Sequence, residues 1–334
     1  MTNRREFLAM AAALPAVAGV AASAGEALLF AAPDAAGQAA PGSAPKLGPP
    51  PTAQQVAARQ GLFVSMHEAS SERFDFPAAM QGYAKAGVRA VEPNLVKVRE
   101  FTQKPGESPA SAKRLLDDLG LKPVSSSNQL GLPEPGQNRQ RSLDDLKWKV
   151  ELATQIGADR IVCPSAGAGM YTLDDFKMGA DNMREAGEIA KQAGITCMLE
   201  FARTSRFAGS LPTALMIVRN ANHPNVRVMM DTYHFWGGIS KFEDLELLRD
   251  GELYHLHFED VPADPPREIQ GQPDRAFPGE GIAPLKRILE TLKRKKYSGP
   301  LSFETFKPEH TAMDPYELAT KVRAAVEPII KSVG

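Results

Sequence analysis

Acidic and imidazole side chains stand at the ends of several short apolar segments in the second half of this 334-residue chain. Glu200 and Asp231 end two successive segments, Glu304 ends the last, and His257 lies in the segment before it, two residues after His255. Three carboxylates brought close together repel one another unless a cation neutralises them. Carboxylate and imidazole ligands together favour Mn²⁺, Co²⁺ or Mg²⁺ over a Cys-based zinc site.

Each of these residues, taken alone, also has a structural explanation. A single Glu at a strand end often caps a helix or forms an ion pair, and Asp231 could cap the turn that follows it. Residues two apart point to the same side of a strand, so one histidine could belong to the core. Four such residues at four consecutive segment ends are harder to explain by caps. We therefore predict one metal site formed by Glu200, Asp231, His257 and Glu304, with His255 as the alternative imidazole.

The elements that must position these residues form a regular alternation from residue 60 onward. Apolar runs alternate with stretches of helical spacing, and the runs lie at 62–66, 88–92, 122–126, 160–163, 196–200, 227–231, 253–258 and 301–305. Eight such repeats predict an α/β fold, a (β/α)8 TIM barrel over residues 59–334. A doubly wound open sheet is the alternative, but no Gly-rich phosphate loop follows the first run. Barrel chemistry occurs at the carboxyl ends of the strands, where these residues stand.

Other polar residues follow the first three runs and would lie on the same rim. His67 and Glu92 are predicted to contact a substrate, and Glu68 and Asn128 are weaker candidates. Hydrogen bonding within the loops is an equal alternative for all four. The connection at 260–282 contains five prolines and no period, which predicts a lid or a substrate wall over the site.

Composition excludes several classes of protein. Apolar residues make up 43% of the chain and charged residues 24%, which is typical of a folded soluble domain. The 39 basic and 40 acidic side chains leave no bulk attraction for nucleic acid or for an anionic membrane. Two cysteines are too few for a disulfide scaffold or a Cys-based zinc cluster. The expected partner is a small molecule, and the oligomeric state stays open.

The first 58 residues differ in character from the rest of the chain. Residues 1–24 contain Arg4 and Arg5, an apolar Ala-rich stretch and the small residues Ala22-Ser23-Ala24. This pattern predicts a twin-arginine signal peptide and a periplasmic or secreted protein without a membrane span after cleavage. The alternative is a chance arginine pair before an Ala-rich helix. Residues 25–58, rich in Ala, Pro and Gly, are predicted to be a disordered tether outside the fold.

At these motifs the chain resembles the xylose isomerase-like barrel superfamily, in particular sugar isomerases and epimerases of the tagatose/psicose 3-epimerase kind. The resemblance covers about residues 60–330. The motifs that carry it are Met198-Leu199-Glu200, Asp231-Thr232-Tyr233-His234, His257-Phe258-Glu259-Asp260, Phe277-Pro278-Gly279-Glu280-Gly281 and Leu301-Ser302-Phe303-Glu304.

The resemblance implies roles for individual residues. It implies one divalent ion, Mn²⁺ first with Co²⁺, Mg²⁺ or Zn²⁺ as alternatives, on the four predicted ligands. It implies Glu200 and Glu304 as an acid–base pair, and His234 and Arg275 as substrate contacts. Arg206 stands where such epimerases often carry a further Glu, so the substrate pocket differs. Multi-zinc endonucleases of the superfamily use an Asp-Arg-His where this chain has Ala276 in place of the His, so nuclease activity is not expected.

The predicted activity is that of a sugar isomerase or epimerase. It would act by proton abstraction next to a carbonyl, through a metal-stabilised enediolate. An exported 3-keto-glycoside lyase or hydratase using the same site is the alternative. A sugar-binding barrel without turnover is a third reading, which Glu200 and Glu304 argue against because a binding protein needs no paired bases.

Overall fold

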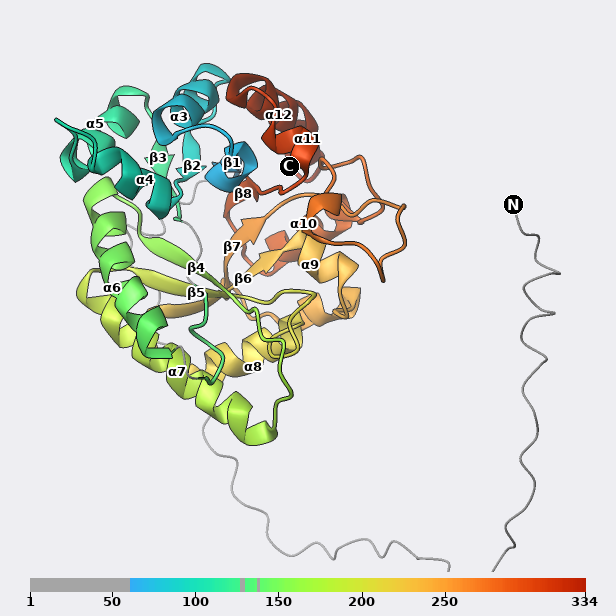
Figure 1. Cartoon of the computed structure of the whole chain (residues 1–334). Coiled ribbons are helices and arrows are strands. Elements are labelled where there is room, and N and C mark those ends of the chain that lie inside the picture. The colour runs from blue at the N-terminus through green and yellow to red at the C-terminus, as the bar shows by residue number, and fades with distance from the viewer. Residues whose placement is uncertain (1–60, 127–129, 137–138) are drawn as a thin grey trace, which may run out of the picture. The chain divides into compact units, whose positions relative to one another are not determined.

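The computed structural model describes residues 61–126, 130–136 and 139–334 (Figure 1). Within them eight parallel strands form one sheet in the order β3-β2-β1-β8-β7-β6-β5-β4. The strands are β1 (Leu62–His67), β2 (Ala90–Glu92), β3 (Lys122–Pro123), β4 (Arg160–Pro164), β5 (Thr196–Glu200), β6 (Val226–Asp231), β7 (Leu253–His257) and β8 (Gly299–Phe303). The first strand pairs with the last, from Leu62 opposite Gly299 to Met66 opposite Phe303. The predicted (β/α)8 TIM barrel is confirmed.

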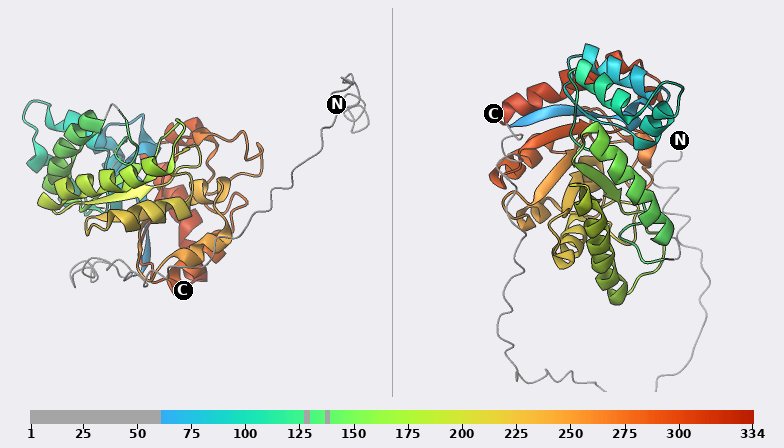
Figure 2. Two further views of the ribbon diagram at one scale, coloured as in Figure 1. Left: turned by 90° about the horizontal axis from the view of Figure 1, so that it is seen from below. Right: turned by 90° about the vertical axis from the view of Figure 1, so that its left-hand side faces the viewer.

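Helices surround the strands, as Figures 1 and 2 show. The helices are α3 (Phe76–Lys85), α4 (Leu95–Thr102), α5 (Pro109–Asp118), α6 (Arg139–Ile156), α7 (Leu173–Gln192), α8 (Leu211–Ala221), α9 (Thr232–Gly237), α10 (Leu285–Arg294), α11 (Pro308–Thr311) and α12 (Pro315–Ser332). Short 3-10 turns lie at Glu68–Ser71, Phe242–Leu247 and Gln272–Asp274. Among the described helices, none combines the length and the apolar character needed to cross a membrane.

Capping residues and glycines set where the helices begin and end. Thr172 caps α7, where its hydroxyl accepts from the Asp175 N–H and the Asp175 carboxylate accepts from the Thr172 N–H. Gly157 and Gly194 follow α6 and α7 with φ of 88° and 70°, a conformation that glycine adopts without a steric penalty. Each turn leads within a few residues into the next strand.

The join between β3 and β4 is the least regular part of the barrel. The run 122–126 predicts a five-residue strand, but regular pairing covers only Lys122 and Pro123. Pro123 has no N–H to donate, which weakens the ladder there. The chain beyond still spans to β4, because the Ser126 carbonyl accepts from the Val162 N–H at 3.3 Å.

Three predictions concern residues that the structure does not describe. The signal peptide at 1–24 and the tether at 25–58 lie outside the described residues, and so does Asn128.

Candidate functional site

The four predicted ligands meet at the carboxyl ends of four consecutive strands. Glu200, Asp231 and His257 are the last residues of β5, β6 and β7, and Glu304 directly follows β8. One ligand atom from each lies within 4.8 Å of all the others, and all four side chains are buried. The four side chains therefore lie together, with His257 as the imidazole among them, and their role as metal ligands stays a prediction.

Unsatisfied polar atoms mark the centre of this cluster. His257 Nδ1 lies 3.2 Å from Glu200 Oε1 and 3.5 Å from Glu304 Oε2. His257 Nδ1, Glu200 Oε1 and Glu304 Oε1 are buried and have no hydrogen-bond partner. Buried polar atoms without partners are costly, so their convergence favours the binding of a cation or a polar group here. Carboxylate oxygens with one imidazole nitrogen fit a divalent metal ion.

The two carboxyls predicted to be the acid–base pair have opposite electrostatic surroundings. Burial, with the nearby charges of Glu304 and Asp231, raises the pKa of Glu200 to about 7, although His257 acts in the other direction. Burial alone would also raise the pKa of Glu304, but His257, His67 and Arg275 outweigh it and lower that pKa to about 2. Within one cluster, Glu200 is therefore able to carry a proton while Glu304 is ionised. Such separation is typical of acid–base pairs.

Arg275 lies inside the cluster rather than at its edge. The guanidinium is fully buried and contacts three carboxylates: Asp231 Oδ2 at 2.6 Å, Glu259 Oε1 at 2.7 Å and Glu304 Oε2 at 3.2 Å. Gln272 Oε1 accepts from both Nε and Nη2 and fixes the plane of the group. Arg275 thus neutralises part of the negative charge of the predicted ligands.

His234 lies one helical turn beyond Asp231, at the start of α9. The Asp231 side chain caps this helix, since Oδ1 accepts from the His234 N–H at 2.9 Å, while Oδ2 faces Arg275. Asp231 therefore caps the helix through Oδ1, as the structural explanation expected, while Oδ2 faces the cluster. His234 Nε2 lies 3.5 Å from Arg275 Nη2, and burial lowers the pKa of His234 to about 4. A neutral ring beside a guanidinium can hold a substrate oxygen.

His67 and Glu92 occupy different sides of the cluster. His67 Nδ1 accepts from the Ala69 N–H, which leaves Nε2 facing Glu304 Oε1 at 3.6 Å. Glu92 lies on the far side of His257, with Oε1 2.8 Å from His255 Nε2 and 3.4 Å from His257 Nε2. His255 therefore contacts Glu92 and stays outside the group of four predicted ligands.

Glu68, the weaker candidate after β1, has a structural contact. It is fully buried, and its Oε2 accepts from the Asn94 N–H at 2.6 Å, next to the start of α4. For this residue the structure shows the hydrogen bonding that was the alternative to substrate contact.

Glu259 belongs to the cluster but was not singled out from the sequence. Its Oε1 accepts from Arg275, its Oε2 is buried without a partner, and burial with the neighbouring Asp231 holds its pKa well above the ordinary value. The available signal was its place directly after the apolar run 253–258, two residues after His257 and inside the motif His257-Phe258-Glu259-Asp260.

The long connection at 260–282 forms a wall that carries Arg275 into the cluster. Asp260 ties its two ends together, because its carboxylate accepts from the N–H groups of Val261, Gly279 and Ala283. The Tyr233 hydroxyl donates to the Gly271 carbonyl and attaches the outer part of the loop to α9. The loop predicted as a lid or wall is therefore anchored at its two ends and at Gly271.

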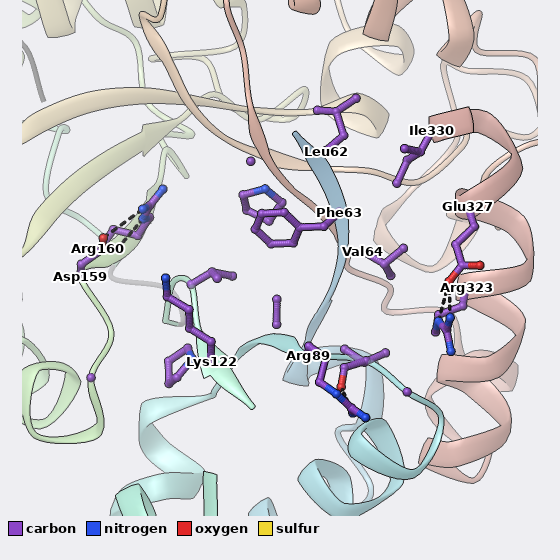
Figure 3. Close-up of a pocket in the computed structure, with 18 of the residues that line it drawn as sticks. Leu62, Phe63, Val64, Arg89, Lys122, Asp159, Arg160, Arg323, Glu327 and Ile330 are labelled. Carbon is purple, nitrogen blue, oxygen red and sulfur yellow. Dashed lines mark hydrogen bonds and ion pairs between the residues drawn. The ribbon is translucent and has the colours of Figure 1, made fainter. Parts of the chain in front are cut away.

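A cavity of about 900 Å³ lies at the opposite end of the barrel (Figure 3). Its lining includes Leu62 and Arg160, the first residues of β1 and β4. Its acidic residues are already paired, Asp159 with Arg160 and Glu327 with Arg323. Among the described residues this end holds no group of metal-ligating side chains. The candidate functional site is therefore the cluster at the carboxyl ends of the strands.

Comparison with known proteins agrees with this geometry. The sequence profile of a family described as "Xylose isomerase-like TIM barrel" matches residues 81–327. The chain belongs to this family. An inosose isomerase of Halalkalibacterium halodurans is 32% identical over 193 residues, which cover 57% of this chain and 68% of the relative.

Two further relatives catalyse other reactions. An L-ribulose 3-epimerase of Mesorhizobium japonicum is 24% identical over 75% of this chain and 82% of the relative. A 3-dehydroshikimate dehydratase of Pseudomonas putida is 25% identical over 69% of this chain but only 36% of that longer protein. The crystal structure of the IOLI protein with a bound zinc atom superimposes with a TM-score of 0.75 at 20% identity, covering 82% of this chain and 99% of that one. The relatives are thus isomerases, epimerases and dehydratases on one fold.

Proposed function

We propose that this protein is a divalent-metal-dependent isomerase or epimerase of sugars or keto-sugars. One observation carries the proposal. Four ligand-type side chains meet at the carboxyl ends of their strands, and buried atoms of three of them have no hydrogen-bond partner; the four are Glu200, Asp231, His257 and Glu304. The inosose isomerase and L-ribulose 3-epimerase relatives support the reaction class. A small-molecule sugar is the proposed partner.

The same four side chains would hold one metal ion, with Mn²⁺ as the first choice because carboxylates dominate the set. Zinc is the alternative, since the IOLI structure contains a zinc atom. When bound, such an ion polarises a substrate carbonyl and stabilises the negative charge that develops as a neighbouring C–H bond breaks.

The chain's own residues would move the proton. Glu304, held ionised by His257, His67 and Arg275, accepts the proton from the carbon next to the carbonyl, and the C–H electron pair passes toward the carbonyl oxygen. Glu200, the second carboxyl of the pair, would carry the proton that is returned. Return to the same carbon from the opposite face inverts it. Return to the former carbonyl carbon, together with transfer of the hydroxyl proton on the first carbon to the former carbonyl oxygen, exchanges aldose and ketose. The roles of the two carboxyls reverse in the opposite direction.

The remaining polar side chains would bind and orient the substrate. Arg275 and His234 lie beside each other and next to Asp231, so they can hold a substrate oxygen close to the reacting carbon. His67 presents its Nε2 to the Glu304 carboxylate and can hold that base in position.

A lyase or dehydratase is the second candidate, and the dehydratase relative favours it. After the same first proton transfer, a leaving group β to the carbonyl departs with its electron pair, protonated by Glu200. A 3-keto-glycoside is the corresponding substrate for a protein exported by the twin-arginine signal that residues 1–24 predict.

The proposal is tested by incubating metal-loaded protein in D₂O with free ketoses, an inosose, 3-dehydroshikimate and a 3-keto-glycoside. Proton NMR reads both the product and the carbon that acquires deuterium. An isomerase or epimerase gives deuterium next to the carbonyl with a new stereoisomer or carbonyl position. A lyase gives an unsaturated ketone and a released group. If metal-loaded protein neither exchanges a proton nor changes any of these substrates, the proposal fails.

A further inference from the structure

The two ring nitrogens of His257 face different groups. Nδ1 points toward Glu200 and Glu304, the predicted metal ligands. Nε2 lies 3.4 Å from Glu92 Oε1, an ion-pair contact without the geometry of a hydrogen bond. Glu92 is the last residue of β2, and its side chain is fully buried. The imidazole is therefore placed between the predicted metal cluster and a separate carboxylate.

Glu92 is itself held by a second histidine. His255 Nε2 donates to Glu92 Oε1 at 2.8 Å, and the His255 and His257 rings meet edge to face with centroids 5.5 Å apart. The two side chains lie on the same side of β7 because the residues are two positions apart, and both contact Glu92 across the barrel interior. Glu92 is thus a fully buried carboxylate that accepts from His255 and faces His257.

Such an arrangement has a known physical effect on an imidazole ligand. The nitrogen that binds a cation must lose its proton, so the other nitrogen carries the hydrogen. A carboxylate facing that N–H fixes the tautomer and the ring orientation and makes the ligand more basic. Glu92 stands on the correct side of His257 to do this, and it lies behind the ring rather than among the atoms that face Glu200 and Glu304.

We propose that Glu92 is a positioning residue that orients His257 for metal binding, with His255 holding Glu92 in place. This inference rests on the proposed metal site and replaces the expected contact between Glu92 and a substrate.

A second metal ion is the main alternative at this position. Glu92, His255 and His257 also offer three ligand atoms within 4.8 Å of one another. The contact between Glu92 Oε1 and His255 Nε2, at 2.8 Å, has the length of a hydrogen bond, and an ionised carboxylate can only accept, so His255 donates in this arrangement. The number of ions bound per chain decides between this arrangement and a second metal site.

The experiment is a calorimetric titration of the metal-free protein with Mn²⁺ and with Co²⁺. Wild type should bind one ion per chain, and Glu92→Gln should bind one ion with an affinity lower by about 10- to 100-fold. Glu68→Gln is the matched control, because Glu68 is another fully buried carboxylate next to a strand end but contacts Asn94 instead of a histidine. Its metal affinity should stay within about twofold of wild type, and Glu92→Asp should recover part of the loss.

A second readout follows the hydrogen of His257 directly. In the Co²⁺ protein, the N–H of a coordinated imidazole gives a strongly shifted NMR resonance that is present in H₂O and absent in D₂O. This resonance should exchange faster with solvent in Glu92→Gln than in wild type. If Glu92→Gln does not fold, His255→Gln, which keeps an N–H donor, should bind metal nearly as well as wild type, and His255→Leu should bind it more weakly.

The outcomes separate the alternatives. Unchanged metal affinity with a higher KM in Glu92→Gln would mean that Glu92 contacts the substrate and would overturn the inference. Two ions in wild type and one in Glu92→Gln would show a second metal site and would also overturn it. Failure of wild type itself to bind an ion would refute the proposed metal site, and the inference with it, whereas normal binding by wild type and by Glu92→Gln refutes only the role of Glu92.

Discussion

Replacing Arg275 by glutamine should strongly destabilise the metal-free protein. The guanidinium is fully buried against Asp231, Glu259 and Glu304, and its loss leaves three buried carboxylates facing one another. Breaking a buried pair in this way costs about 3–5 kcal/mol. For a domain of this size, such a loss of unfolding free energy corresponds to a fall of roughly 10 °C in Tm.

Thermal unfolding followed by circular dichroism in EDTA measures this loss. Arg323→Gln is the control, because Arg323 pairs with Glu327 on a partly exposed helix surface, where a pair contributes less than about 1 kcal/mol. Added Mn²⁺ should raise the Tm of Arg275→Gln more than that of wild type, since the ion brings positive charge to the same carboxylates. An Arg275→Gln protein that unfolds in EDTA at the wild-type temperature would refute the view that Arg275 balances the charge of this cluster.

Three other predictions concern catalysis, pH and export. Glu200→Gln and Glu304→Gln should each lower turnover by at least about 10²–10⁴-fold. One of the two variants should still exchange a substrate C–H proton in D₂O. Normal turnover in a metal-loaded variant would contradict the proton-transfer scheme. Burial raises the pKa of Glu68 to about 7 from 4.5, so its contribution to stability is present below pH 4.5 and is lost as the pH rises through 7. Glu68→Gln should remove this pH dependence of the unfolding free energy, which amounts to at most about 3 kcal/mol. Urea unfolding at several pH values measures it, and identical pH profiles for variant and wild type would count against the prediction. Replacing Arg4 and Arg5 by lysine should retain the protein in the cytoplasm, and unchanged cell fractionation would argue against a twin-arginine signal.

The barrel and the four clustered residues could be predicted because they depend on period and order. Parallel strands of a barrel place their carboxyl ends on one rim, so Glu200, Asp231 and Glu304 had to lie close together once the strands were identified. The choice of His257 over His255 could not be made from spacing, because both side chains point inward. The position along β7 makes the choice: His257 is the last residue of the strand and lies level with the other three side chains, whereas His255 lies one layer deeper in the barrel.

The contacts of Glu92 and Arg275 could not be predicted from the sequence for two different reasons. Glu92 meets His257 across the barrel interior, although β2 and β7 are separated by β1 and β8 in the sheet. Strand order gives neighbours within a sheet but not the pairs that meet through its middle. Arg275 lies in a connection without a period, so its position depends on how Asp260 and Gln272 fold that loop.

The way Asp260 closes the 260–282 connection has a consequence for how this protein can be altered. Asp260 also pairs with Ala276 through two backbone hydrogen bonds, which fixes the residue directly after Arg275 independently of the outer part of the loop. Residues 263–269, which end at the exposed Ile269, lie beyond this closure. Substitutions or grafted segments there can change the shape and polarity of the surface around the site while the guanidinium stays in place. New substrate preferences can therefore be selected in this tip by exchanging loop residues, without rebuilding the charges that the proposed reaction uses.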